Sequence, residues 1–502
     1  MTPNWIDKAV SFFDPQAGLK RIRARAAAES MLRYEGAQSG RRTANWMATG
    51  TSANAEIGPD LPYLRSRSRD LVRNNPLMRK ALRVLVANTV GSGLRPEADT
   101  GNPALNASID TAFDVWSKEC DADGQLDFYG LQQLIDRSVK ESGEVIVRDR
   151  YRYAADGFHV PYQLQVLEAD YIDSNRQWWP NEFKGATIAG VAFDVLGTRK
   201  AYWLFPWHPG DVVKSVNDGF VSRLISADQV THIYEKERPG QVRGAPWFAS
   251  ILIPAYDLDG YEDAERMRKK IEACLAVFVQ QAEGIEGSPI STTSTDAKTG
   301  NRIETLEPGM IEYTKPGETI AVAAPAATGG YGEYVTKQHH IQAAGAGVMY
   351  EQMTGDLSLV NYSSFRAGHI EFRADVAAYR SKTLIPMGLQ PIWNKFIDAA
   401  FAAGKIKAVN YGCKWTAPAW QSVDPEKDAT ANLIEVRTGR KTWPQMVTEA
   451  GLDPDKQLAQ IVETNKDLDA NGVVLDCDPR AVDRQRGAFQ VKQTEAVVGK
   501  DN

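Results

Sequence analysis

Four acidic residues in one short stretch of the chain are the best candidates for acid–base catalysis. They are Glu141, Glu144, Asp149 and Asp170. Paired carboxylates with unequal pKa values can serve as a general acid and a general base. Such a pair needs at least one carboxylate whose pKa is shifted inside a cleft. A nucleic-acid or carbohydrate hydrolase built on these residues is therefore one possible function.

Residues that ligate metals occur in the sequence, but their spacing does not fit a metal site. When Gly124 of the run Asp121–Gly124 is placed at the sixth position of a calcium loop, Gly130 falls at the twelfth, where a bidentate glutamate is required. His339 and His340 are adjacent, so they point to different helix faces, and no HExxH motif contains them. The four cysteines form no CxxC pair. We expect no metal and no cofactor.

Motifs for phosphate binding and for nucleophilic catalysis are absent from the sequence. No phosphate loop of the GxxxxGKS or GxxxxGKT form is present. Gly91-Ser92-Gly93 lacks the third glycine and the preceding strand of a dinucleotide loop. No GxSxG elbow is present either. Together these absences favour a structural or assembly role, and we expect that the chain is not an enzyme.

The charge of the chain argues against a protein that wraps nucleic acid. The 502 residues carry a formal net charge of −6, whereas tight binding to DNA is driven by neutralising phosphates. The basic excess is local and lies between residues 20 and 83. This stretch fits either an arm that meets a polyanion or an acidic partner, or solvated helix faces. No apolar run reaches the roughly 18 residues that a membrane helix needs, so we expect no membrane partner.

The elements that must position these side chains begin after a weakly patterned arm, residues 1–60. Asn75-Pro76 and Asn102-Pro103 are caps with proline at the first helical position, and Asp127 caps a third helix that Gly143 ends. Alternation with a period of two then predicts strands at residues 144–151, 162–167, 187–195, 201–205 and 230–234. The sequence thus predicts an α+β region, with the helices first and an antiparallel sheet after them.

The second half of the chain has an unusual order of elements. A long helix is predicted over residues 255–280, followed by a small β-rich insertion, 281–330, that is punctuated by Gly, Pro, Ser and Thr. Helical patterns return at 334–353 and 363–384, with a break at Thr354-Gly355-Asp356 between them. Two shorter helices are predicted in the tail, at 442–450 and 453–463. Helix, insertion, helix, loop, helix is not a typical order for an enzyme.

Five motifs, in the same order along the chain, resemble portal proteins of tailed bacteriophages, in the lambda-like family. The resemblance extends over roughly residues 60–425 and is weak in the arm and the tail. The motifs are LRSRSRDLVRNNPLMRKALRVLVANTVGSGLRP at 64–96, VLEADYID at 166–173, RPGQVRGAPW at 238–247, LEPGMIEYTKPGETI at 306–320 and DLSLVNYSSFRAGHIEFR at 356–373.

The resemblance implies an α+β subunit of the portal type that forms a ring. It divides the chain into a flexible basic arm (1–60), a wing of helices and antiparallel sheet (61–254), a first stem helix (255–280), a small β-rich clip (281–330), a second stem helix (331–353), a tunnel loop (354–362), a channel-side helix with a return to the wing (363–424) and a helical C-terminal crown (425–502).

The function implied by the resemblance is that of the portal vertex. A ring of about twelve copies would conduct double-stranded DNA into the procapsid and out again at infection. The implied partners are the terminase large subunit, the major capsid and scaffold proteins, and head-completion or adaptor proteins. The implied location is the virion, after assembly in the cytoplasm of the host bacterium. A different virion ring or collar protein is an alternative, although such proteins are usually much smaller.

The resemblance also points to the residues of a DNA channel. A conduit must pass DNA without gripping it, so uncompensated Lys and Arg are not expected along it. We expect the tunnel loop to project into the lumen, and its residues are Asp356, Leu357, Ser358, Leu359, Val360, Asn361 and Tyr362. Lys337, Arg366 and Arg373 are the expected sparse contacts to the DNA backbone. Packing between neighbouring subunits is the alternative role for the loop.

The acidic insertion is the implied docking region for the terminase. Between residues 281 and 320 it holds seven acidic and three basic residues. Its glutamates Glu304, Glu307, Glu312 and Glu318 are the candidate docking residues. Short strands in such an insertion suit an edge where neighbouring subunits pair. For the basic segment 20–42, contact with capsid, scaffold or DNA is expected.

Overall fold

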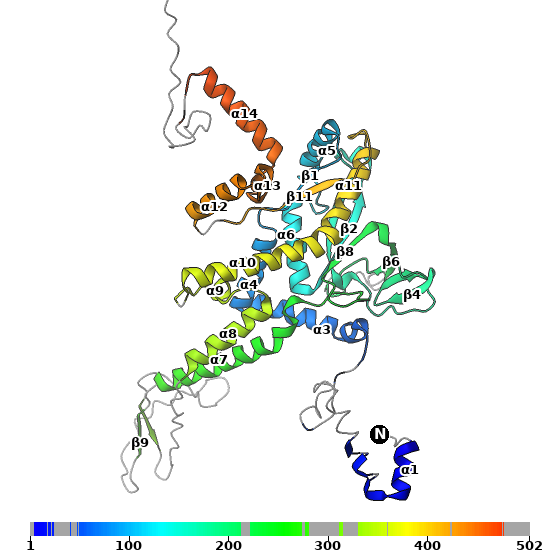
Figure 1. The fold of residues 1–502 in the computed structure, drawn as a ribbon, viewed down its shortest axis with the longest axis vertical. Helices are drawn as coiled ribbons and strands as arrows, with labels where there is room; N and C mark the ends of the chain where they lie inside the picture. Colours follow the sequence, from blue (N-terminus) through cyan, green and yellow to red (C-terminus); the bar gives the residue numbers. More distant parts are fainter. Residues whose placement is uncertain are drawn as a thin grey trace, which may run out of the picture. The chain divides into compact units, whose positions relative to one another are not determined.

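The computed structural model describes residues 51–211, 221–273, 277–280, 311–314, 330–358, 360–421, 424–473 and 475, together with part of the first 50 residues. The chain divides into two compact units, Met1–Ser52 and Ala53–Asn502. The first unit contains helix α1 (Trp5–Phe13). The second unit contains all the other elements described below (Figure 1).

Helix α3 (Ala53–Asn74) begins inside the stretch that the sequence assigns to the arm. The expected boundary at residue 60 is therefore wrong, because Ala53 and Leu61 are buried and anchor the helix on the body. The alternating arginines also belong to this helix. Arg65 is buried, whereas Arg67 is exposed, so the basic run serves two faces of the helix.

Three capped helices follow, as the sequence predicts. They are α4 (Pro76–Thr89), α5 (Pro103–Trp116) and α6 (Phe128–Ser142). The side chains of Asn75, Asn102 and Asp127 accept hydrogen bonds from the first backbone N–H groups of the three helices. Gly143 ends α6 in the left-handed conformation, with φ 89°. An added Cβ there would also lie 2.5 Å from the backbone carbon of Ala245, so only glycine fits.

A three-stranded antiparallel sheet packs beside these helices, in the order β3-β2-β8. Its strands are β2 (Glu144–Tyr151), β3 (Tyr162–Glu168) and β8 (Val230–Tyr234), close to their predicted bounds. Aromatic side chains of α5, α6 and a later helix fill the main core beside the sheet. Among them, Trp116 stacks on Tyr162 at 5.7 Å and lies 4.9 Å from the ring of Phe396.

A second antiparallel sheet has the order β4-β5-β6-β7. The single strand predicted at 187–195 is wrong, because it divides into β4 (Lys184–Ile188) and β5 (Val191–Asp194). Ala189 and Gly190 between them both have positive φ and turn the chain. The sheet continues with β6 (Arg199–Leu204) and β7 (Arg223–Ser226). Short 3₁₀ turns lie at Ala154–Asp156, Ala169–Tyr171, Ala227–Gln229 and Trp247–Ile251.

The long helix predicted at 255–280 is shorter in the structure. Helix α7 spans Leu252–Ala273, and Val277–Gln280 forms strand β9, which pairs in parallel with β10 (Ile311–Thr314). The β-branched and aromatic run Val277-Phe278-Val279 favours an extended chain over a helix. The predicted boundary at residue 280 is therefore wrong. Strand β10 lies in the insertion that the sequence predicts to be β-rich, and residues 281–310 and 315–329 of this insertion lie outside the described residues.

Helix α8 (Tyr331–Ala346) returns beside α7 (Figure 1). The helix predicted to run without interruption to residue 353 is wrong, because Gly347 ends α8 in the left-handed conformation, with φ 72°. The short helix α9 (Tyr350–Thr354) then leads to the predicted tunnel loop.

Helix α10 (Tyr362–Tyr379) continues without a break through a π-helix (Arg380–Leu389) into α11 (Gln390–Ala402). The predicted end near residue 384 was therefore too early. Strand β11 (Cys413–Thr416) then pairs antiparallel with β1 (Arg95–Ala98), which brings the chain back to the first helices.

The tail consists of α12 (Pro425–Arg437), α13 (Trp443–Glu449) and α14 (Pro454–Ala470). The two helices predicted in the tail are thus present, and α14 is longer than expected. In the part of the chain that the structure describes, no helix is both long and apolar enough to cross a membrane.

Candidate functional site

The predicted tunnel loop connects two helices whose ends are both capped. Gly355 ends α9 with φ 82°, and the Asn361 side chain opens α10 by accepting from the backbone N–H of Ser364 at 2.8 Å. Inside the loop, a carboxylate oxygen of Asp356 accepts from the backbone N–H of Ser358 at 2.9 Å. Leu357 is 60% exposed. The loop therefore has fixed ends and presents an uncharged side chain to solvent, while Leu359 lies outside the described residues.

Asp356 carries the only formal charge in this loop, and it stays ionised. Hydrogen bonds from the side chain and the backbone N–H of Ser358 lower the pKa of its carboxyl group below the usual value. A carboxylate at this position repels phosphate rather than binding it.

Lys80 of α4 lies against the start of the loop and is a basic residue that the sequence did not single out. A Cβ placed on Gly355 would lie 2.7 Å from the Lys80 Nζ atom. Helix α9 packs on α4, which explains this approach. The nearby Arg79 and Arg83 of α4 are exposed. Lys80 belongs to the basic stretch that the sequence shows, but only the packing of α9 on α4 brings it to the loop.

The three residues that are expected to contact DNA differ in the contacts that they make with other residues of the chain. The Arg366 guanidinium pairs with Asp428 at 2.8 Å. The Arg373 guanidinium lies 5.2 Å from the ring centre of Trp420 and donates to the backbone oxygen of Gln421 at 3.0 Å. Arg366 therefore links α10 to the tail helix α12, and Arg373 links α10 to the segment just before the tail. Lys337 of α8 is exposed and has no ion pair with any residue in the described ranges.

The last residue of the loop also contacts the tail. The Tyr362 ring lies 5.4 Å from the Lys427 Nζ atom, and its hydroxyl is 3.5 Å from Asp424. Asp356–Ser358 are exposed, and Tyr362 at the end of the loop is 45% exposed although it also contacts α12.

The four candidate acid–base residues all pair with basic side chains. Glu144 is buried and meets Arg65 at 2.8 Å and Arg243 at 2.6 Å. Glu141 pairs with Arg137, Asp149 with Lys395 and Asp170 with Arg65 and Arg69. Glu144 and Asp170 share Arg65, whereas Glu141 and Asp149 each lie in an ion pair of their own.

The charged groups around Glu144 and Asp170 disfavour a role for either carboxyl group as a proton donor. Burial alone would raise the pKa of Glu144, but Arg243 and His232 lower it below the usual range. Burial likewise opposes the effect of Arg65 and Arg69 on Asp170, and the arginines lower its pKa. Both groups remain ionised at neutral pH, so neither can act as a general acid.

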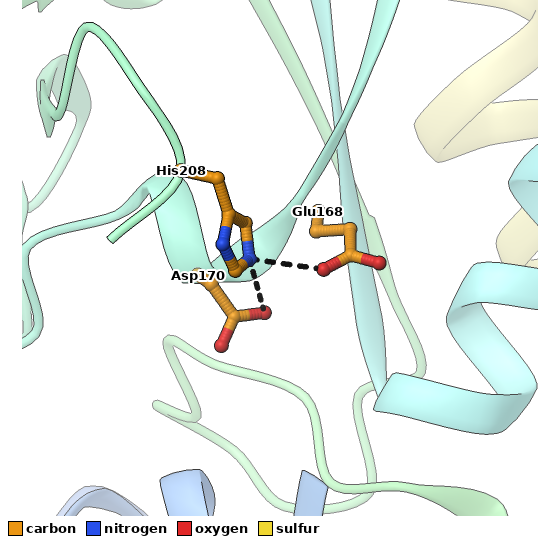
Figure 2. A group of neighbouring side chains, drawn as sticks. All are labelled: Glu168, Asp170 and His208. Atoms are coloured by element: carbon orange, nitrogen blue, oxygen red, sulfur yellow. Dashed lines mark ion pairs between the residues drawn. The ribbon is translucent and has the colours of Figure 1, made fainter. Parts of the chain in front are cut away.

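Among the described residues, one cluster of three His, Asp or Glu side chains is close enough to share a metal ion, namely Glu168, Asp170 and His208 (Figure 2). Their candidate ligand atoms lie within 4.8 Å of one another. The His208 Nε2 atom is 3.1 Å from Glu168 and 4.0 Å from Asp170. Arg69 also contacts both carboxylates, at 3.1 and 2.6 Å. A guanidinium already compensates the charge that a metal ion would neutralise, so this group is better described as an ion-pair cluster.

Asp121 of the calcium-like run has a structural role. Its carboxylate accepts from the backbone N–H groups of Asp123, Gln125 and Leu126, at 2.9–3.0 Å. The run is therefore a turn between α5 and α6, as the missing glutamate indicates.

The expected terminase-docking residues are not placed by the structure. Glu304, Glu307 and Glu318 lie outside the described residues. Glu312 belongs to β10, of which only the backbone is described. Their role stays a prediction.

Residues 39–380 match the family model of the lambda-family phage portal protein, which is more than half of the chain. The chain belongs to the lambda family of phage portal proteins. This membership confirms the resemblance and the portal function that the sequence predicted. Portal proteins are structural proteins, which agrees with the paired state of the candidate acid–base residues.

Curated relatives of this portal protein match over most of their length. The probable portal protein of Halomonas phage phiHAP-1 is 26% identical over 88% of this chain and 90% of the relative. The portal protein of Escherichia phage N15 is 20% identical, over 85% and 88%. Portal protein B of Escherichia phage lambda is 19% identical, over 88% and 90%.

Solved structures give a weaker likeness. A chain in the virion of a native gene transfer agent (GTA) particle matches with a TM-score of 0.40 and 14% identity, over 79% of this chain and 94% of that chain. A chain in the neck of the native GTA particle, computed with C12 symmetry, matches with a TM-score of 0.39 and 15% identity, over the same shares. These values are too low to add to the family match.

Proposed function

We propose that this portal protein forms a ring of about twelve copies at one vertex of a phage capsid, with the loop 354–362 facing the lumen. Double-stranded DNA passes through the ring during packaging and ejection. Helices α7 and α8 form the stem, and the tail helices form the crown. The protein is a component of the virion and is assembled in the host cytoplasm.

The observation that carries this proposal is the exposed, cation-free tip of the loop. Asp356 and Leu357 project from two capped helix ends and are engaged by no basic side chain in the described ranges. A lumen lined by such residues does not neutralise phosphates, so DNA can slide. Lys80 lies beside Gly355, and it joins Lys337, Arg366 and Arg373 as the proposed sparse contacts to the DNA backbone.

A matched pair of lysine substitutions tests the location of the loop. Leu357→Lys places one new cation per subunit at the loop, and Leu196→Lys places the same cation at a turn of the second sheet, where Leu196 is 91% exposed. We expect Leu357→Lys to slow DNA packaging in a purified system, because each phosphate that is neutralised strengthens binding. Leu196→Lys is expected to package at the wild-type rate.

Two results would contradict the proposal. Equal packaging rates for the two variants would place the loop away from DNA. A purified chain that remains monomeric in electron micrographs, with no ring and no central hole, would exclude the ring itself.

The partners follow from the same proposal. The insertion between α7 and α8 docks the terminase large subunit, while the wing and the crown meet capsid, scaffold and adaptor proteins. Deletion of residues 285–325 is expected to abolish packaging without preventing ring formation. Packaging by the deleted protein would exclude the insertion as the docking region.

A further inference from the structure

A cavity of about 250 Å³ lies where α7 passes the junction of α3 and α4 and the side of α8. It is separate from the tunnel loop and from the ion-pair cluster at His208. Its polar lining comes from three parts of the chain, namely Asn75 ahead of α4, Asp259 and Glu262 of α7, and His339 and Gln342 of α8.

Gln342 is the unusual residue of this cavity. It is only 1% exposed, and neither its amide nitrogen nor its amide oxygen has a hydrogen-bond partner among the described residues. The Nε2 atom of His339, one helical turn earlier, is also buried without such a partner. Burying a polar group without a hydrogen-bond partner is unfavourable. Three unsatisfied atoms on one side of a polar cavity therefore indicate an occupant that is not part of the chain.

The opposite wall makes the cavity negative. Asp259, Glu262 and Asp263 of α7 line it, and Arg266 is the only cation among its lining residues. Arg266 contacts Glu262 through Oε2 at 3.0 Å, which leaves Oε1 facing the His339 Nε2 atom at 4.0 Å. A surplus of carboxylates and a free imidazole nitrogen favour a cation over an anion or an apolar ligand.

We propose that this cavity binds one divalent cation through His339 Nε2, Glu262 Oε1 and the amide oxygen of Gln342, with water as the remaining ligands. Two ligand atoms about 2.1 Å from one ion can be at most about 4.2 Å apart. The 4.0 Å between Nε2 and Oε1 therefore fits an ion placed between them, or an ion that reaches one of them through water. Mixed nitrogen and oxygen ligands suit an ion such as Mn²⁺.

The bound ion would connect α7 to α8. This inference stands on the cavity itself and does not require the proposed ring or DNA channel.

Titration of the metal-free, full-length chain with Mn²⁺, followed by electron paramagnetic resonance of the free ion, tests the site. We expect one Mn²⁺ per chain in the wild type. Gln342→Leu and Glu262→Gln are each expected to weaken binding by at least the ~10-fold that even an outer-shell residue contributes. Glu333→Gln removes an exposed carboxylate from the same helix α8 and is expected to leave the affinity unchanged. Glu168→Gln is the matched control for the His208 cluster.

The possible results of the Mn²⁺ titration can be distinguished from one another. No bound Mn²⁺ in the wild type would mean that water alone fills the cavity, and equal affinity in both cavity variants would place the ion elsewhere; either result overturns the proposal. Loss of binding in Glu168→Gln alone would assign the ion to the other cluster and would also overturn it. If Gln342→Leu fails to fold, Glu262→Gln decides, because the Glu262 side chain is already 23% exposed.

Discussion

His232 is held as a neutral imidazole by the donors and acceptors around it. An Arg199 guanidinium nitrogen lies 3.0 Å from its Nδ1 atom, and because arginine can only donate, Nδ1 must accept. The proton therefore resides on Nε2, which donates to the buried Glu144 carboxylate at 2.9 Å. Burial lowers the pKa of His232 to about 4; Glu144 opposes this change, while Arg199 and Arg243 add to it. Protonation would place a hydrogen on Nδ1 and break the bond from Arg199.

This arrangement predicts how stability depends on pH. An unfolded histidine titrates near 6.5, so between pH 6.5 and about 4 the unfolded chain binds a proton that the folded chain does not. The unfolding free energy should therefore fall as the pH drops through this window, by about 3 kcal/mol at most from His232. Urea unfolding of wild type and His232→Gln between pH 7 and 4 measures the contribution.

The variant comparison isolates His232 from the acidic residues that titrate in the same range. The stability difference between wild type and His232→Gln should shrink as the pH falls. A constant difference for His232→Gln would show that this imidazole is not neutral in the folded chain.

At the scale of elements, helices with local signals could be predicted and those fixed by tertiary contacts could not. Asn75 marks the start of a helix in the sequence because its side chain can accept hydrogen bonds from the first backbone N–H groups. Gly143 marks the end of a helix because a residue without a side chain readily adopts the left-handed conformation. The start of α3 at Ala53 has no comparable signal, because it depends on burial against the body. The contacts of Arg366 with Asp428 and of Arg373 with Gln421 could not be predicted either, because these partners lie more than forty residues later in the chain.

One tryptophan just before the tail adds to the contacts that Tyr362 and Arg366 make with α12. The guanidinium groups of Arg373 and Arg380 lie 5.2 and 5.0 Å from the ring centre of Trp420. Each such contact contributes about 0.5–2 kcal/mol. Trp420→Ala should therefore increase amide hydrogen exchange across α12–α14 and leave β2 and β3 protected. Trp207→Ala removes an exposed tryptophan and serves as the control; unchanged exchange in the tail of Trp420→Ala would show that other contacts hold it.

At the scale of the molecule, the net charge of −6 has a different meaning in a ring than in a single chain. A monomer with this charge is poorly suited to wrap DNA, so the net charge by itself argues against DNA as a ligand. In a ring, the relevant charge is that of the few side chains along the channel, repeated in every copy. The described part of the loop supplies one carboxylate and no cation, so mild acidity is compatible with a conduit and excludes only a protein that grips DNA.

The salt dependence of DNA binding distinguishes a conduit from a gripping protein. Each phosphate that a protein neutralises contributes about −0.9 to the slope of log K against log salt. The assembled wild-type ring should therefore bind linear double-stranded DNA weakly, with a slope far shallower than about −10, the value for a repressor that holds its DNA. Leu357→Lys repeats one new cation around the ring and should make the slope steeper, whereas Leu196→Lys should not. Filter binding across a salt series measures all three slopes. Tight binding with a steep slope in the wild type would mean that the ring grips DNA through residues outside the loop, and the channel assigned to residues 354–362 would then be wrong.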